Sequence, residues 1–97
     1  MDIAGMQENA QEAAALLKSL ANTSRLVVLC ALVTRAHTVG ELEELTGLSQ
    51  SAISQHLARL REDELVSTRR EAQRIYYSLE NPNVKAILTT LHRIYCS

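Results

Sequence analysis

The sequence predicts a mainly helical α+β fold with one β-hairpin, in the order helix, helix, helix, helix, strand, strand, helix. Apolar residues recur at helical spacing through most of the chain. Two later segments, LVSTRRE and RIYYSL, are instead rich in β-branched and aromatic residues. Because no linker or repeat interrupts the 97 residues, we expect a single domain over residues 1–97.

Two helices are predicted in the first third of the chain. Residues 7–20 are rich in strong helix formers, and their apolar stripe consists of Ala10, Ala13, Leu17 and Leu20. The N-cap candidates Asn22, Thr23 and Ser24 precede a second helix that ends near Arg35. Its apolar stripe, at positions i, i+3, i+4 and i+7, consists of Leu26, Leu29, Cys30 and Val33.

Residues 41–62 predict a helix, a tight turn and a second helix. Thr38 and Glu41 fit a capping box for the first of these helices, and Gly47 ends it. Its inward residues are expected to be Leu42 and Leu45. Ser49 can cap the next helix, whose core side consists of Ile53, Leu57 and Leu60. Because a helix turns by about 100° per residue, the opposite face presents Ser51, Ser54, Gln55 and Ala58.

A basic hairpin and a final helix complete the prediction. The hairpin turns near Ala72 and Gln73 and carries Arg69, Arg70 and Arg74. Pro82 suits the first turn of the last helix, whose apolar positions are Val84, Ile87, Leu88, Leu91 and Ile94. A helix-turn-helix followed by a basic hairpin is typical of a winged helix-turn-helix, which binds DNA through its second helix and its wing. A merely solvated Ser and Gln face is the alternative for an isolated helix.

The charge balance restricts DNA binding to a local surface. The chain has 10 Lys and Arg against 11 Asp and Glu, so the strongly basic balance of many nucleic-acid-binding domains is missing. Basic residues nevertheless gather in the second half, at Arg59, Arg61, Arg69, Arg70 and Arg74.

No segment approaches the roughly 18 apolar residues of a membrane span, and no signal-peptide pattern is present, which favours a cytoplasmic protein with no membrane partner. No nucleophile elbow or phosphate loop is present either, which argues against an enzyme.

The apolar stripes of the first and last helices predict a homodimer. A winged unit of this size has too little interior to bury both stripes within one protomer. The alternative is that the two stripes complete the core of a monomer.

The cysteines, Cys30 and Cys96, are too few and too far apart for a secreted disulfide framework, so a reaction between them would be regulatory.

The order of elements and the string LSQSAISQHLARLREDELVSTRREAQRIYYSL resemble the ArsR/SmtB family of winged-helix repressors over nearly the whole chain. The motifs LLKSLAN, SQHLARLR, REAQRIYYSL and LHRIYC are similar to its persulfide- and redox-responsive BigR-like branch, which includes SqrR, YgaV and HlyU. The resemblance implies a homodimer bound to an inverted repeat in double-stranded operator DNA. The DNA-contacting residues that it implies are Ser51, Ser54, Gln55 and His56 in the groove and Arg69, Arg70, Gln73 and Arg74 in the wing. The helical wheel puts His56 at the flank, which favours a phosphate contact or helix support over base reading.

The resemblance also gives the cysteines a role. From the residues alone, Cys30 on an apolar stripe is a core residue, while Cys96 lies at a helix end that can approach another sulfur. In the BigR-like branch, a cysteine of the second helix and one at the end of the last helix form a redox pair, and both positions are filled here. The resemblance therefore implies a sensor without cofactor, in which reactive sulfur species bridge the two thiols and DNA is released.

Three alternatives remain open from the sequence. The third helix lacks the cysteine motif with which many family members bind metals, and His92 and Cys96 supply only two ligands, so no metal site is predicted. A metal-responsive regulator is still an alternative. A second is an anti-repressor that displaces another DNA-binding protein, as the likeness to HlyU allows. The third is a protein-interaction module that has lost DNA binding, for which the acidic balance is the argument.

Overall fold

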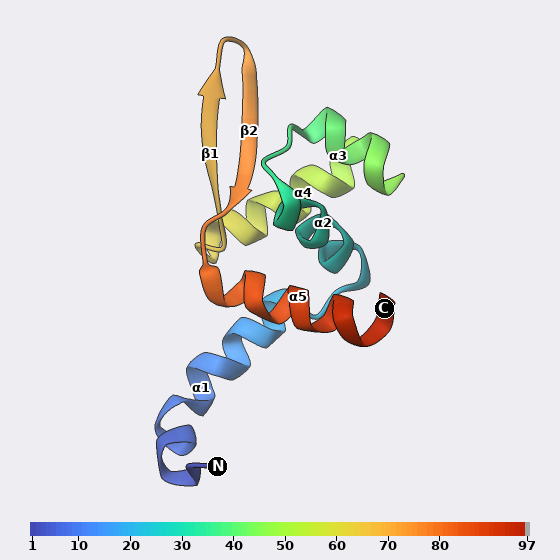
Figure 1. Cartoon of the computed structure of the whole chain (residues 1–97). Helices are drawn as coiled ribbons and strands as arrows, with labels where there is room; N and C mark the ends of the chain where they lie inside the picture. The colour runs from blue at the N-terminus through green and yellow to red at the C-terminus, as the bar shows by residue number, and fades with distance from the viewer. Residues whose placement is uncertain (97) are drawn as a thin grey trace.

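Residues 1–96, which the computed structural model describes, form five helices and one antiparallel hairpin (Figure 1). The helices are α1 (Ile3–Leu20), α2 (Thr23–Thr34), α3 (Val39–Thr46), α4 (Gln50–Glu62) and α5 (Pro82–Cys96). The hairpin consists of β1 (Val66–Glu71) and β2 (Arg74–Leu79). This arrangement confirms the predicted order of elements.

Side-chain caps fix where the first four helices begin. The Asp2 carboxylate accepts a hydrogen bond from the Gly5 N–H at 3.0 Å, so α1 begins at Ile3 and not at residue 7 as predicted. The prediction missed this turn because it placed no cap before Gln7. The other caps agree with the predicted ones, which are Asn22 for α2, the Thr38 and Glu41 capping box for α3, and Ser49 for α4.

The core lies where α2, α4, α5 and the base of the hairpin meet. Its fully buried side chains are Val28, Leu29, Leu42, Ile53, Leu57, Leu60, Val84 and Leu88. The predicted inward face of α4 is therefore confirmed. The prediction for α3 is half wrong, because Leu42 is buried whereas Leu45 is 62% exposed. With only 8 residues, α3 fully buries a single side chain, Leu42, while Val39 packs against the core partly buried.

The buried side of α2 is rotated from the predicted stripe. Its buried residues are Arg25, Val28, Leu29 and Leu32, again at i, i+3, i+4 and i+7. Cys30 is exposed. Because α2 is apolar at every position from Leu26 to Val33, periodicity fits either stripe, and the packing of α2 against α3, α5 and β2 decides between them. The interpretation of Cys30 as a core residue is therefore wrong, and Cys30 is a surface thiol.

α1 and the hairpin project from opposite ends of the molecule (Figure 1). Only Ser19 and Leu20 of α1 are buried, so most of the predicted apolar stripe of α1 is uncovered in one protomer. Within residues 1–96, no single helix is long and apolar enough to cross a membrane. Only α1 and α2 taken together have the length and apolar composition of a membrane span, and the two helices are bent by 93° relative to one another.

Besides packing against the helices, the hairpin is bound to the loop before α3 by a backbone bridge from β2. Its strands pair from Val66 with Leu79 at the base to Glu71 with Arg74 at the tip, where Ala72 has a positive φ of 55°. In addition, His37 and Tyr77 exchange two backbone hydrogen bonds of 3.0 and 2.8 Å. This bridge connects the loop before α3 to the wing, so the wing and the helix-turn-helix have a fixed relative orientation.

α4 ends in a Schellman motif whose left-handed position is a glutamate. The Leu65 N–H donates to the Leu60 carbonyl at 2.9 Å, the Glu64 N–H donates to the Arg61 carbonyl at 3.0 Å, and Glu64 has a φ of 61°. This conformation costs a residue with a Cβ atom roughly 1–2 kcal/mol, a cost that glycine avoids. We expect Glu64→Gly to raise the free energy of unfolding by about 0.5–1 kcal/mol, because the freer unfolded chain offsets part of the gain.

Urea denaturation of the reduced protein measures this effect. The matched reverse substitution is Gly47→Ala at the end of α3, where φ is 74°. It should lower the free energy of unfolding by about 1 kcal/mol, because alanine has a Cβ atom where glycine has none. A Glu64→Gly protein that unfolds at the same or a lower urea concentration than the parent would contradict the assignment of strain to Glu64.

Candidate DNA-binding surface and thiol pair

The outer side of α4 presents short polar side chains to solvent. Ser51, Ser54 and Gln55 are exposed, whereas Ile53 and Leu57 on the opposite side are buried. The buried side fixes the helix on the core, and α3 packs against α4 across the turn at Gly47. Small hydroxyl and amide side chains on a fixed helix can approach base edges in a major groove, where an amide pairs with adenine.

His56 lies at the edge of this polar face. It is half-buried, and burial lowers the pKa of its imidazole, with a further contribution from the positive charge of Arg25. Arg25 is itself buried and donates from Nε to the Ser19 carbonyl at 2.6 Å. His56 therefore lies toward the junction of α1 and α2, a position that fits helix support better than base reading.

Arg69 is held by two neighbours on the hairpin. Its guanidinium forms an ion pair with Glu71 and lies over the ring of Tyr76, with 5.1 Å from the guanidinium carbon to the ring centre. Tyr76 is also its cross-strand partner in the ladder. The carboxylate offsets the charge of Arg69, so this side chain offers less net attraction to a phosphate than a free arginine.

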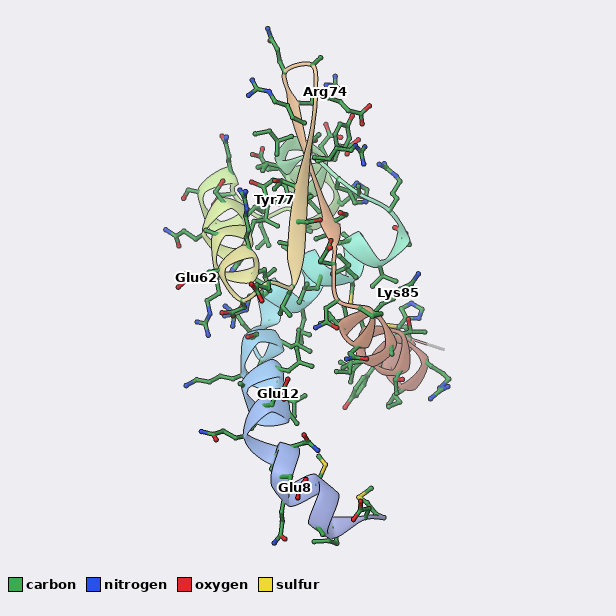
Figure 2. The ribbon with its side chains drawn as sticks, turned by 90° about the vertical axis from the view of Figure 1, so that its left-hand side faces the viewer. Glu8, Glu12, Glu62, Arg74, Tyr77 and Lys85 are labelled. Atoms are coloured by element: carbon green, nitrogen blue, oxygen red, sulfur yellow. The ribbon has the colours of Figure 1, made fainter. Side chains whose placement is uncertain are left out.

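Arg70 and Arg74 carry the uncompensated charge of the wing. Arg70 donates from Nε to the Ala72 carbonyl at 3.2 Å, and Arg74 lies at the tip of the hairpin (Figure 2). Within the part of the chain that the structure describes, neither arginine forms an ion pair. Gln73 is exposed in the turn between the strands. The tip of the wing is therefore locally positive, as phosphate binding requires.

The two cysteines belong to the facing helices α2 and α5. Both thiols are free, and both residues are exposed. A cavity of about 290 Å³, called the α2–α5 cavity below, is lined by Cys30, Val33, Thr34, Leu88, Thr89 and His92. Partial burial at this cavity raises the pKa of the Cys30 thiol, and the negative charge of Cys96 raises it further. Cys96 is therefore within electrostatic reach of Cys30.

Cys30 also borders a second hollow beside α2, which shares Cys30 and Thr34 with the α2–α5 cavity. This second hollow, of about 460 Å³, includes His37 and Arg35 among its lining residues. His37 is 3% exposed, and its Nδ1 lies 3.4 Å from Oε1 of Glu41 without forming a hydrogen bond to any of residues 1–96. The hydrogen bond from the Thr38 N–H lowers the pKa of Glu41; desolvation partly opposes it, and the nearby Arg35 and His37 lower the pKa further. Cys30 therefore neighbours both α5 and the loop that is bridged to the wing.

Sequence reasoning missed two residues that contact the candidate site, Tyr76 beside Arg69 and His37 near Cys30. The register of the hairpin identifies Tyr76, because a turn at Ala72 and Gln73 puts Arg69 opposite Tyr76. Nothing in the pattern indicates His37, whose burial depends on how the loop packs. Within residues 1–96, no cluster of three or more His, Cys, Asp or Glu side chains is arranged to hold a metal ion.

Comparison with known proteins agrees with this geometry. Residues 22–68 match the family described as bacterial regulatory protein, arsR family. The chain is 50% identical over 96 residues to the transcriptional activator HlyU of Vibrio cholerae, which covers 99% of this chain and 89% of HlyU. It is 49% identical over 96 residues to the HTH-type transcriptional regulator YgaV of Escherichia coli, which covers 98% of this chain and 97% of YgaV.

The fold agrees as well. The structure matches that of the transcriptional repressor BigR from Xylella fastidiosa with a TM-score of 0.94 at 38% identity, over 100% of this chain and 99% of BigR. These similarities confirm the winged-helix fold and the family resemblance that the sequence motifs predict. The chain belongs to the arsR family of bacterial regulatory proteins and is a transcriptional regulator, not an enzyme.

Proposed function

We propose that the chain is a cytoplasmic repressor that binds double-stranded operator DNA as a homodimer and releases it when reactive sulfur species join Cys30 to Cys96. The observation that carries this proposal is that α2 and α5 pack against one another and that each bears an exposed free thiol, with the charge of Cys96 raising the pKa of Cys30 as further support. Two exposed thiols on facing helices are poised to bridge, whereas a buried core cysteine is inert.

The DNA-binding part of the proposal is supported by two adjacent surfaces. The polar outer face of α4 supplies Ser51, Ser54 and Gln55 for contacts in the major groove. The tip of the wing supplies Arg70, Gln73 and Arg74 for the phosphates or the minor groove. Arg69 is a weaker phosphate ligand because Glu71 accompanies it, and His56 supports the helix.

The homodimer is supported by the apolar side chains that one protomer leaves uncovered. They lie on α1 and at the end of α5, at Ile3, Met6, Leu17, Ile94 and Tyr95. Burying these residues against a second copy removes them from water and joins two recognition helices into one rigid unit. Half-sites of an inverted repeat then match the two-fold symmetry of the protein.

The switch is a two-electron oxidation of the thiols by a polysulfide. The Cys96 thiolate attacks a sulfur of the polysulfide, a shorter polysulfide or hydrosulfide leaves, and Cys96 becomes a persulfide. The Cys30 thiolate then attacks Sγ of Cys96, hydrosulfide leaves, and the Sγ–Sγ bond forms. The bridge ties α2 to α5, and because α5 belongs to the proposed dimer interface, the spacing of the two recognition helices changes and DNA is released.

Fluorescence anisotropy tests the proposal. The reduced protein is titrated onto labelled DNA from its own promoter region, then treated with polysulfide, and then with a reductant. Tight binding that polysulfide abolishes and reductant restores supports the repressor and its thiol switch. Binding that ignores polysulfide keeps the repressor, overturns the switch and directs attention to metals. No binding in any state, at low as well as physiological salt, favours a protein-interaction module.

A second candidate is activation by displacement of another DNA-binding protein. It is favoured by the 50% identity to a relative that is named a transcriptional activator. The same operator contacts serve both roles, so protein geometry does not separate them. Transcription from the promoter in vitro, with and without the protein and with no other DNA-binding protein present, distinguishes them, because only a repressor lowers transcription under those conditions.

A further inference from the structure

The α2–α5 cavity holds a basic side chain to which the thiol switch so far assigns no role. His92 of α5 lines this cavity together with Cys30 of α2. On α5, His92 precedes Cys96 by four residues, which is one helical turn, so its side chain and that of Cys96 lie on the same side of the helix. His92 is also exposed and can exchange a proton with water.

The other residues of the cavity cannot accept a proton. Val33 and Leu88 form apolar walls, and Thr34 and Thr89 contribute hydroxyl groups. Among the residues that line the cavity, the histidine side chain is therefore the one that can act as a base toward the Cys30 thiol. Arg25 lies on α2 and Arg35 directly follows this helix, but neither residue lines the cavity. Arg93 comes directly after His92 in the sequence and therefore lies on a different side of α5.

Closing the bridge requires the loss of one specific proton. Burial and the charge of Cys96 both raise the pKa of Cys30, so Cys30 carries its proton at neutral pH. A protonated thiol is a poor nucleophile in sulfur exchange, because the thiolate is the attacking species. A base within the cavity would remove this obstacle.

Resting on the proposed thiol switch, we propose that His92 accepts the Cys30 proton as the bridge to Cys96 closes. The proton moves from Cys30 Sγ to the imidazole, and the thiolate attacks Sγ of the Cys96 persulfide. The sulfur–sulfur bond of the persulfide breaks, hydrosulfide leaves with the electron pair, and the Sγ–Sγ bond forms. In this step the outer sulfur is reduced and the sulfur of Cys30 is oxidised, while Sγ of Cys96 keeps the oxidation state that it reached when the persulfide formed. The imidazolium then returns its proton to the hydrosulfide or to water.

The test follows bridge formation in the full chain after polysulfide addition, by mass spectrometry without reductant, between about pH 5.5 and pH 9.5. In the parent the rate is already high at neutral pH, because the base in the α2–α5 cavity accepts the Cys30 proton. In His92→Gln the rate at pH 7 falls by at least about tenfold, and its rise moves to the higher pH at which the Cys30 thiol ionises unaided. Added imidazole restores the rate of a His92→Ala variant.

Arg93→Gln is the matched control, because it removes a positive charge from the neighbouring position of α5 without removing a base. It should keep the pH profile of the parent. Equal rates and pH profiles in the parent and His92→Gln overturn the inference, as does an equal loss in Arg93→Gln. Both results leave the thiol switch itself intact.

Alkylation separates the inference from the proposed function. In a Cys96→Ser background, iodoacetamide labels Cys30 alone, and replacing His92 by Gln should slow this labelling at neutral pH and shift its pH profile upward. If the parent forms no bridge but the labelling depends on His92, the inference about the proton holds and the redox switch fails. If the labelling of Cys30 is independent of His92, the inference is overturned.

Discussion

Replacing Cys30 by serine is expected to leave the DNA affinity of the reduced protein unchanged and to abolish the release of DNA by polysulfide. Cys30 is exposed, so a hydroxyl in place of its thiol leaves no cavity in the core and no buried polar group without a partner. The serine cannot form a sulfur–sulfur bond with Cys96. Anisotropy titrations before and after polysulfide treatment measure both effects, and the loss of switching should be complete.

Cys96→Ser should behave in the same way in the anisotropy assay, because the bridge needs both sulfurs. The two variants differ in a second readout. Mass spectrometry should find a persulfide on Cys96 in Cys30→Ser and little modification of Cys30 in Cys96→Ser, because partial burial raises the pKa of the Cys30 thiol. If Cys30→Ser still releases DNA on oxidation, the paired mechanism is wrong. Release would then require only the modification of Cys96.

This prediction depends on the exposure of Cys30, which the sequence alone does not reveal. The periodicity of α2 made Cys30 a core residue, and only the packing of α5, α3 and β2 around α2 shows that its thiol is at the surface. A helix that is apolar at every position from 26 to 33 carries no internal signal for its buried side. Cys30 and Cys96 are also 66 residues apart in the sequence, so local pattern cannot show that their helices pack against one another.

The elements that were predicted correctly carry strong local signals. α4 has a serine cap, an apolar stripe and a polar face, so its buried and exposed sides follow from one helical wheel. The capping box of Thr38 and Glu41 and the left-handed Gly47 fix both ends of α3. The failure at Leu45 arose because two turns of helix are too short to define a stripe. Local signals therefore predict the buried and exposed sides of α4, whereas the proposed thiol pair depends on tertiary contacts or on the family resemblance.

The second large effect is expected at Gln55, which lies on the exposed face of α4. We expect Gln55→Ala to weaken binding to operator DNA by about 10- to 100-fold, because a lost bidentate contact to a base costs roughly 1–3 kcal/mol. Binding to unrelated DNA should hardly change. The ratio of the two affinities, measured by anisotropy at a single salt concentration, is therefore the decisive quantity. Alanine is a good helix former, so α4 should remain folded.

Arg70→Gln is the contrasting variant, because a phosphate contact has a different signature from a base contact. Arg70 lies on the wing without an ion-pair partner among residues 1–96, so its loss should weaken binding to every DNA sequence alike. It should also reduce the slope of log affinity against log salt by about 1. If Gln55→Ala instead lowers both affinities equally, α4 acts through the backbone and sequence reading must lie elsewhere, in the wing or in DNA shape. Opposite signatures at the two sites would assign base reading to α4 and electrostatic anchoring to the wing.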